Sequence, residues 1–70
     1  MKNDLIRARL CEAVKISGLS RGEIAKRADV SETTVRRYMN GETYPSLNML
    51  VKLCDILEVT ADYLLGITEY

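Results

Sequence analysis

The sequence predicts an all-α fold of five helices, and three observations lead to that prediction. Its apolar content is almost entirely aliphatic, with no Trp, no Phe and four Tyr, a composition that suits helices packed on helices. Apolar residues recur at helical spacing in several segments of the chain. Short breaks containing Ser, Thr and Gly, which start and stop helices, separate these segments. With 70 residues, the chain is expected to form one domain, residues 1–70.

The first two helices are defined by a glycine stop and a capping box. The first is expected over about residues 4–17, directly before Gly18. Ser20 and Glu23 then have the spacing of a capping box, in which the hydroxyl accepts from a first-turn N–H and the carboxylate reaches back to the Ser20 N–H. The second helix is expected to follow over residues 21–28.

The third helix follows a joint of only three residues. Ser31 is its expected N-cap, and the helix covers about residues 32–39 before it ends at Asn40-Gly41. So short a joint forces the second and third helices to cross steeply, with Val30 and Val35 filling the angle between them. This is the arrangement of a helix-turn-helix.

Two further helices are expected in the C-terminal part. Ser46 is the N-cap of the fourth, whose apolar stripe runs from Leu47 to Leu57. Thr60 is the N-cap of a short fifth helix that Gly66 stops.

Charge is distributed unevenly along a chain whose formal net charge is zero. Residues 1–37 hold nine basic against five acidic residues, a net charge of +4. Residues 38–70 hold one basic against five acidic residues, a net charge of −4. The basic part can approach phosphates, although ordinary solvated helix charge explains the same pattern.

Several classes of function are disfavoured by composition. The chain has no His, no cluster of metal ligands, no Gly-rich phosphate loop and no nucleophile beside a base, so we expect no catalytic residues, no cofactor, no metal and no small-molecule ligand. Cys11 and Cys54 are expected to be small core residues of a reducing compartment rather than a disulfide. Without a membrane span or a signal-peptide segment, the protein is expected to be cytoplasmic and away from membranes.

Residues 18–66 resemble the phage-repressor-like (Cro, lambda-repressor or Xre) helix-turn-helix proteins. The capping box, the Val-Ser turn, the aromatic-x-x-Gly end of the third helix, the Pro-Ser-Leu start of the fourth and the final Val-Thr-x-Asp-x-Leu-Leu occur in register. The resemblance implies a five-helix lambda-repressor-like domain. It also implies sequence-specific binding to double-stranded DNA as a transcriptional regulator, expected to be a repressor, with the third helix in the major groove.

The resemblance also assigns candidate DNA contacts. In the family, the first two and the sixth residues of the third helix read base edges, and here these are Glu32, Thr33 and Arg37. Arg37 can hold guanine with two hydrogen bonds. Glu32 either accepts from cytosine, or repels phosphates and so sharpens selectivity, or serves only as a partner of the helix dipole. Contacts with the sugar-phosphate chain are expected from Arg21, Ser31, Thr34, Arg36, Asn40 and Thr43.

Three features depart from the family pattern. Asp29 stands where relatives often carry Gly, at a turn position with positive φ, which costs a non-glycine residue on the order of 1 kcal/mol. Val14 and Met39 stand where many relatives pair a buried Arg with a Glu, and we expect these two apolar side chains to be in contact. Glu42 places an acidic residue in the loop after the third helix, which is often basic in relatives, and this predicts modest affinity for DNA.

One such unit reads only a few base pairs, so a homodimer on a near-palindromic operator is expected. Residues 1–3 and 67–70 are expected to be flexible or to form an interface with a second copy. The chain is either a complete small regulator or the N-terminal piece of a longer repressor. The alternative function is a protein-interaction module of the same fold, an antitoxin or anti-repressor partner, with weak or no DNA binding. The neutral net charge, together with Glu32 and Glu42, favours that alternative.

Overall fold

A computed structural model describes the backbone of residues 2–67 and the side chains of residues 5–67. This part of the chain contains five helices: α1 (Lys2–Ser17), α2 (Arg21–Ala28), α3 (Glu32–Asn40), α4 (Leu47–Leu57) and α5 (Ala61–Leu65). The all-α prediction is therefore confirmed. No helix within residues 2–67 is long and apolar enough to cross a membrane.

The terminal segments are described in part. Lys2 and Asn3 belong to α1, which starts two residues before the predicted Asp4. At the other end, the Ile67 N–H donates to the Asp62 carbonyl at 2.9 Å, although the Ile67 side chain is exposed. Residue 1 and residues 68–70 lie outside the described part.

All four predicted N-caps of α2 to α5 are confirmed. Ser20, Ser31, Ser46 and Thr60 each accept a hydrogen bond from the backbone N–H three residues on, at 3.1–3.2 Å. The capping box at α2 is only half formed, because the Glu23 carboxylate accepts from Arg27 Nε at 3.0 Å instead of reaching back to the Ser20 N–H. A side-chain partner one turn along the helix competes with the backbone donor for that carboxylate.

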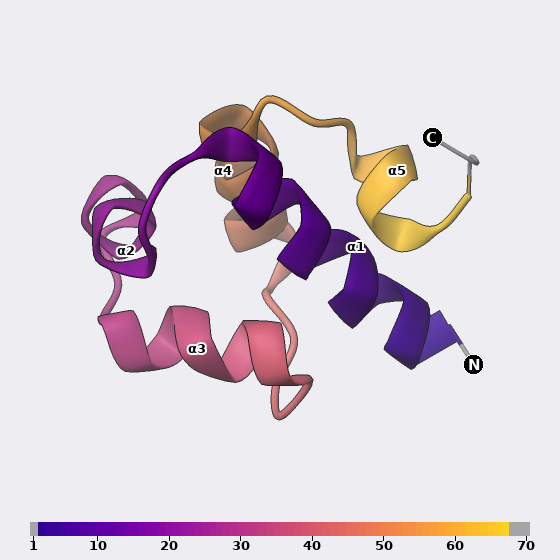
Figure 1. The fold of residues 1–70 in the computed structure, drawn as a ribbon. Coiled ribbons are helices and arrows are strands. Elements are labelled where there is room, and N and C mark those ends of the chain that lie inside the picture. Colours follow the sequence, from indigo (N-terminus) through magenta and orange to yellow (C-terminus); the bar gives the residue numbers. More distant parts are fainter. Residues whose placement is uncertain (1, 68–70) are drawn as a thin grey trace.

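The core is built from aliphatic side chains of all five helices (Figure 1). Its buried members are Leu10, Ala13, Val14, Ile24, Ala25, Val35, Leu53, Leu57 and Leu64. Helix α1 lies between α3 and α5 and contacts both, while α2 packs on α3 and α4 (Figure 1). As a result, α3 lies along one edge of the molecule, with one face free of the core.

Helix α5 is attached to α1 through Tyr63. Its hydroxyl donates to Glu12 Oε1 at 2.8 Å, and the Arg9 guanidinium lies 4.7 Å from its ring centroid. Arg9 Nη1 also donates to the Tyr63 carbonyl at 2.8 Å. The hydrogen bond to Glu12 is the main cause that raises the pKa of the Tyr63 phenol, because ionisation would break it, and burial and the Glu12 charge add to the effect.

The two cysteines are free, as predicted, but both are half-buried and neither is a buried member of the core. Cys11 Sγ donates to the Met39 carbonyl at 3.2 Å. Burial, with the Asp55 charge beside it, raises the pKa of the Cys54 thiol, which disfavours the thiolate. Val14 belongs to the buried core and Met39 packs against that core. Their direct contact stays a prediction.

Candidate nucleic-acid interface

The joint between α2 and α3 is made by one left-handed residue and one cap. Asp29 has φ 61° and ψ 45°, and its N–H bonds to carbonyls of the last turn of α2. The Val30 N–H then donates to the Ala25 carbonyl at 3.0 Å, and Ser31 starts α3. The positive φ predicted at Asp29 is confirmed, and the chain turns into the new helix direction within three residues.

Packing between the two helices fixes the direction of α3. Ala25 and Val35 are buried where the helices meet, with relative exposures of 4% and 2%. Val30 packs against the same cluster, so the predicted filling of the interhelical angle is confirmed. A helix held on one side by a buried β-branched residue presents its opposite side to solvent in a fixed orientation.

The solvent face of α3 carries every residue that the sequence assigned to base reading. Glu32, Thr33, Arg36, Arg37 and Asn40 are all exposed. At 100° per residue they span roughly 140° of the helix circumference, opposite the half-buried Tyr38 and the buried Val35. Helix α3 lies along one edge of the fold (Figure 1), so this polar face is open to solvent.

The residues assigned to phosphate contacts divide into two groups. The first group has exposed side chains and consists of Arg21 at the first position of α2, Arg36, Asn40 and Thr43. Ser31 and Thr34 are joined to each other, with 2.9 Å between their hydroxyl oxygens, and Ser31 also caps Thr34 N. Their hydroxyls are already used at the N-terminus of α3, so their main role in this structure is to hold that terminus.

The end of α3 holds contacts that sequence reasoning missed. Glu42 Oε1 lies 4.0 Å from Arg37 Nε, and Asn40 Nδ2 donates to Glu42 Oε2 at 3.4 Å. Arg7 of α1 lies beside the same turn, its Cδ 3.0 Å from the position of a Cβ on Gly41. The position of Arg7 beside Gly41 gave no signal in the sequence, because only the packing of α1 against α3 brings these two residues together.

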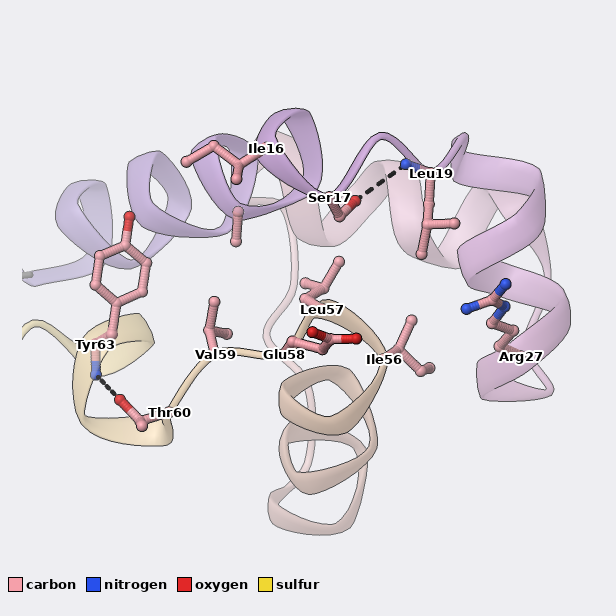
Figure 2. Close-up of a pocket in the computed structure, with 11 residues that line it drawn as sticks. Ile16, Ser17, Leu19, Arg27, Ile56, Leu57, Glu58, Val59, Thr60 and Tyr63 are labelled. Atoms are coloured by element: carbon pink, nitrogen blue, oxygen red, sulfur yellow. Dashed lines mark hydrogen bonds between the residues drawn. The ribbon is translucent and has the colours of Figure 1, made fainter.

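A separate groove of about 690 Å³ lies between the end of α1, the last turn of α2 and the connection from α4 to α5 (Figure 2). None of its lining side chains comes from α3, and most of them are apolar. Of its charged members, Arg27 is paired with Glu23, and Glu58 is exposed on the connection itself. This groove therefore adds no donors or acceptors to the polar face of α3.

Two short helices joined at a fixed angle, with a capped second helix that presents a polar face, define a helix-turn-helix protein. The chain belongs to the helix-turn-helix family, whose sequence model matches residues 12–64. This match confirms the resemblance and the lambda-repressor-like fold inferred from the sequence.

One relative is a phage repressor. The chain is 33% identical over 61 residues to the cryptic phage CTXphi transcriptional repressor RstR of Vibrio cholerae serotype O1 (strain ATCC 39315 / El Tor Inaba N16961), a match that covers 87% of this chain and 54% of the relative. The chain thus spans about half the length of the curated relative it matches. No solved structure matches the chain.

Proposed function

We propose that this chain binds double-stranded DNA in a sequence-specific manner as a transcriptional regulator, acting as a repressor, with α3 in the major groove. The observation that carries the proposal is the exposed polar face of α3, which the buried Val35 and the capped joint hold in one orientation. Membership of the helix-turn-helix family and the similarity to a transcriptional repressor support it.

In this proposal the base edges are read by Glu32, Thr33 and Arg37. Arg37 is the principal reader, because a guanidinium matches the two acceptors of guanine with paired hydrogen bonds worth roughly 1–3 kcal/mol of discrimination. Arg21, at the N-terminus of α2, contacts phosphate, where the helix dipole already favours an anion. Arg36 of α3 also contacts phosphate.

The unit binds DNA as a homodimer. Helix α3 has nine residues and is about 14 Å long, so only a few base pairs lie within its reach. A second copy on a near-palindromic operator doubles the number of bases read and places two α3 helices about one turn of DNA apart.

A salt titration of binding to a random duplex tests the proposal. Affinity should fall steeply as salt rises, with a slope of about −0.9 per phosphate contacted on a log–log plot. The variants Arg21→Ala and Arg36→Ala should each reduce the magnitude of that slope by about one. Lys52→Ala on α4 is the matched control and should leave it unchanged. No binding at low salt would refute the proposal.

A protein-interaction module is the second candidate function. The observation that favours it is the contact of Glu42 with Arg37 and Asn40, since it uses two side chains that would otherwise face DNA. This candidate predicts that the chain fails to bind the random duplex at any salt concentration, so the same titration separates the two functions.

A further inference from the structure

Two carboxylates lie at opposite ends of the DNA-facing helix, next to groups that would otherwise receive DNA. We propose that Glu32 and Glu42 are selectivity residues whose charges suppress binding to non-cognate DNA. The inference rests on the proposed function and adds a role to it. In α3 the base readers would supply affinity for the operator, while these two acids would reduce affinity for every other duplex.

Glu42 interacts with two donors of the exposed face of α3. The chain turns at Gly41, and the Glu42 N–H donates to the Arg37 carbonyl at 2.9 Å, which brings the acid back over the end of the helix. Its carboxylate then lies 4.0 Å from Arg37 Nε and accepts from Asn40 Nδ2 at 3.4 Å. The Glu42 charge thus stands beside two side chains that a duplex would approach.

This contact contributes little to the stability of the fold. The side chains of Arg37 and Glu42 are 57% and 54% exposed, and ion pairs so exposed are weak. A negative charge at the C-terminus of a helix also opposes the helix dipole. An effect of Glu42 on DNA binding can therefore be measured without loss of the fold.

Glu32 brings a second carboxylate to the other end of α3. Its Oε1 lies 3.7 Å from the position that a Cβ would take on Gly22, in the first turn of α2. The same position lies 3.9 Å from the Ser20 hydroxyl that caps α2. The protein thus places its own anion beside the helix terminus at which Arg21 would meet a phosphate.

Selectivity follows because cognate DNA and random DNA present different hydrogen-bonding groups to Arg37 and Glu32. Both acids are exposed, so they can move aside at small cost. A cognate site compensates by giving guanine acceptors to Arg37 and a donor to Glu32, whereas a random duplex offers mainly phosphates, which the carboxylates repel. Neutral Gln at either position should therefore raise affinity for random DNA more than affinity for the operator.

The test compares Glu32→Gln and Glu42→Gln with Asp55→Asn, an exposed acid of α4 that changes net charge by the same amount. Binding is measured to a random duplex and to the site that the unmodified protein selects, at several salt concentrations, and folding is checked by circular dichroism. Each Glu variant should bind the random duplex about fivefold more tightly, as expected for a unit charge a few ångströms from phosphate in a water-like dielectric. Asp55→Asn should change it less than about twofold, because the charge is distant and screened.

Two results would overturn the inference while leaving DNA binding intact. In the first, neither Glu variant binds the random duplex more tightly than Asp55→Asn. In the second, affinity for the operator rises as much as affinity for random DNA, so that the ratio between them does not change. If neither the unmodified protein nor any variant binds either duplex at low salt, the proposed function itself is refuted and the inference with it.

Discussion

Asp29 allows the strain in the joint between α2 and α3 to be measured. Its φ of 61° lies in the left-handed region, which costs a residue with a Cβ roughly 1–2 kcal/mol and costs Gly nothing. Among the described residues, no hydrogen bond or ion pair joins the Asp29 carboxylate to a partner, so its removal breaks no such contact. Replacement by Gly should therefore remove the strain.

The gain in stability from Asp29→Gly is smaller than the full strain energy, because Gly gives the unfolded chain more conformational freedom, worth roughly 0.5–1 kcal/mol. Asp29→Gly should then stabilise the fold by about 0.5–1 kcal/mol. For a domain of this size, that corresponds to a rise in Tm of about 2–8 °C. Thermal unfolding followed by far-ultraviolet circular dichroism measures it directly.

Two matched variants show whether the backbone angle is the cause. Glu58, after α4, has nearly the same geometry, with φ 58° and ψ 46°, so Glu58→Gly should also raise Tm. Asp55 lies inside α4, and Asp55→Gly should lower stability by about 0.3 kcal/mol, the difference between the helix propensities of Asp and Gly. A fall in Tm for Asp29→Gly would refute the reasoning.

Three other predictions concern the cap, the α1–α5 contact and the core. Ser31→Ala removes the cap of α3 and should cost about 1 kcal/mol in urea unfolding, while an unchanged midpoint would show that the cap contributes nothing. Glu12→Gln should lower the raised pKa of Tyr63 toward its ordinary value near 10, as followed by the NMR shift of the ring Cζ. Because the pKa of folded Tyr63 is raised, its contribution to stability is present below about pH 10 and lost as pH rises through the folded pKa, and Glu12→Gln should weaken that loss. Val14→Ala and Met39→Ala should be non-additive by about 0.5 kcal/mol or more in a double-mutant cycle if the side chains touch, and additive if they do not.

Helix boundaries could be predicted from the sequence because local contacts set them. A hydroxyl that bonds to a backbone N–H three residues on, as at Ser20 and Thr60, needs no tertiary information. The left-handed residue at Glu58 was missed because Glu, unlike Gly, does not mark the end of a helix. The conformation itself is a local one, since the Glu58 N–H closes the end of α4 on the Cys54 carbonyl.

The candidate site could be predicted only in part. Exposure of Glu32, Thr33 and Arg37 follows from helical spacing once Val35 is taken as buried. The contacts of Glu42, and the position of Arg7 beside the end of α3, depend on how the loop folds back and on how α1 packs. Periodicity carries no information on either feature.

The central claim is that α3 reads bases through Arg37, and selection of bound sites from random duplex DNA tests it most directly. The selection is run with the unmodified protein, with Arg37→Ala and with Lys52→Ala as the control. The account predicts a near-palindromic site in which Arg37→Ala relaxes one guanine position in each half and leaves the other positions intact, while Lys52→Ala selects the unmodified site. An identical site for Arg37→Ala, or no enriched site for the unmodified protein, would contradict it.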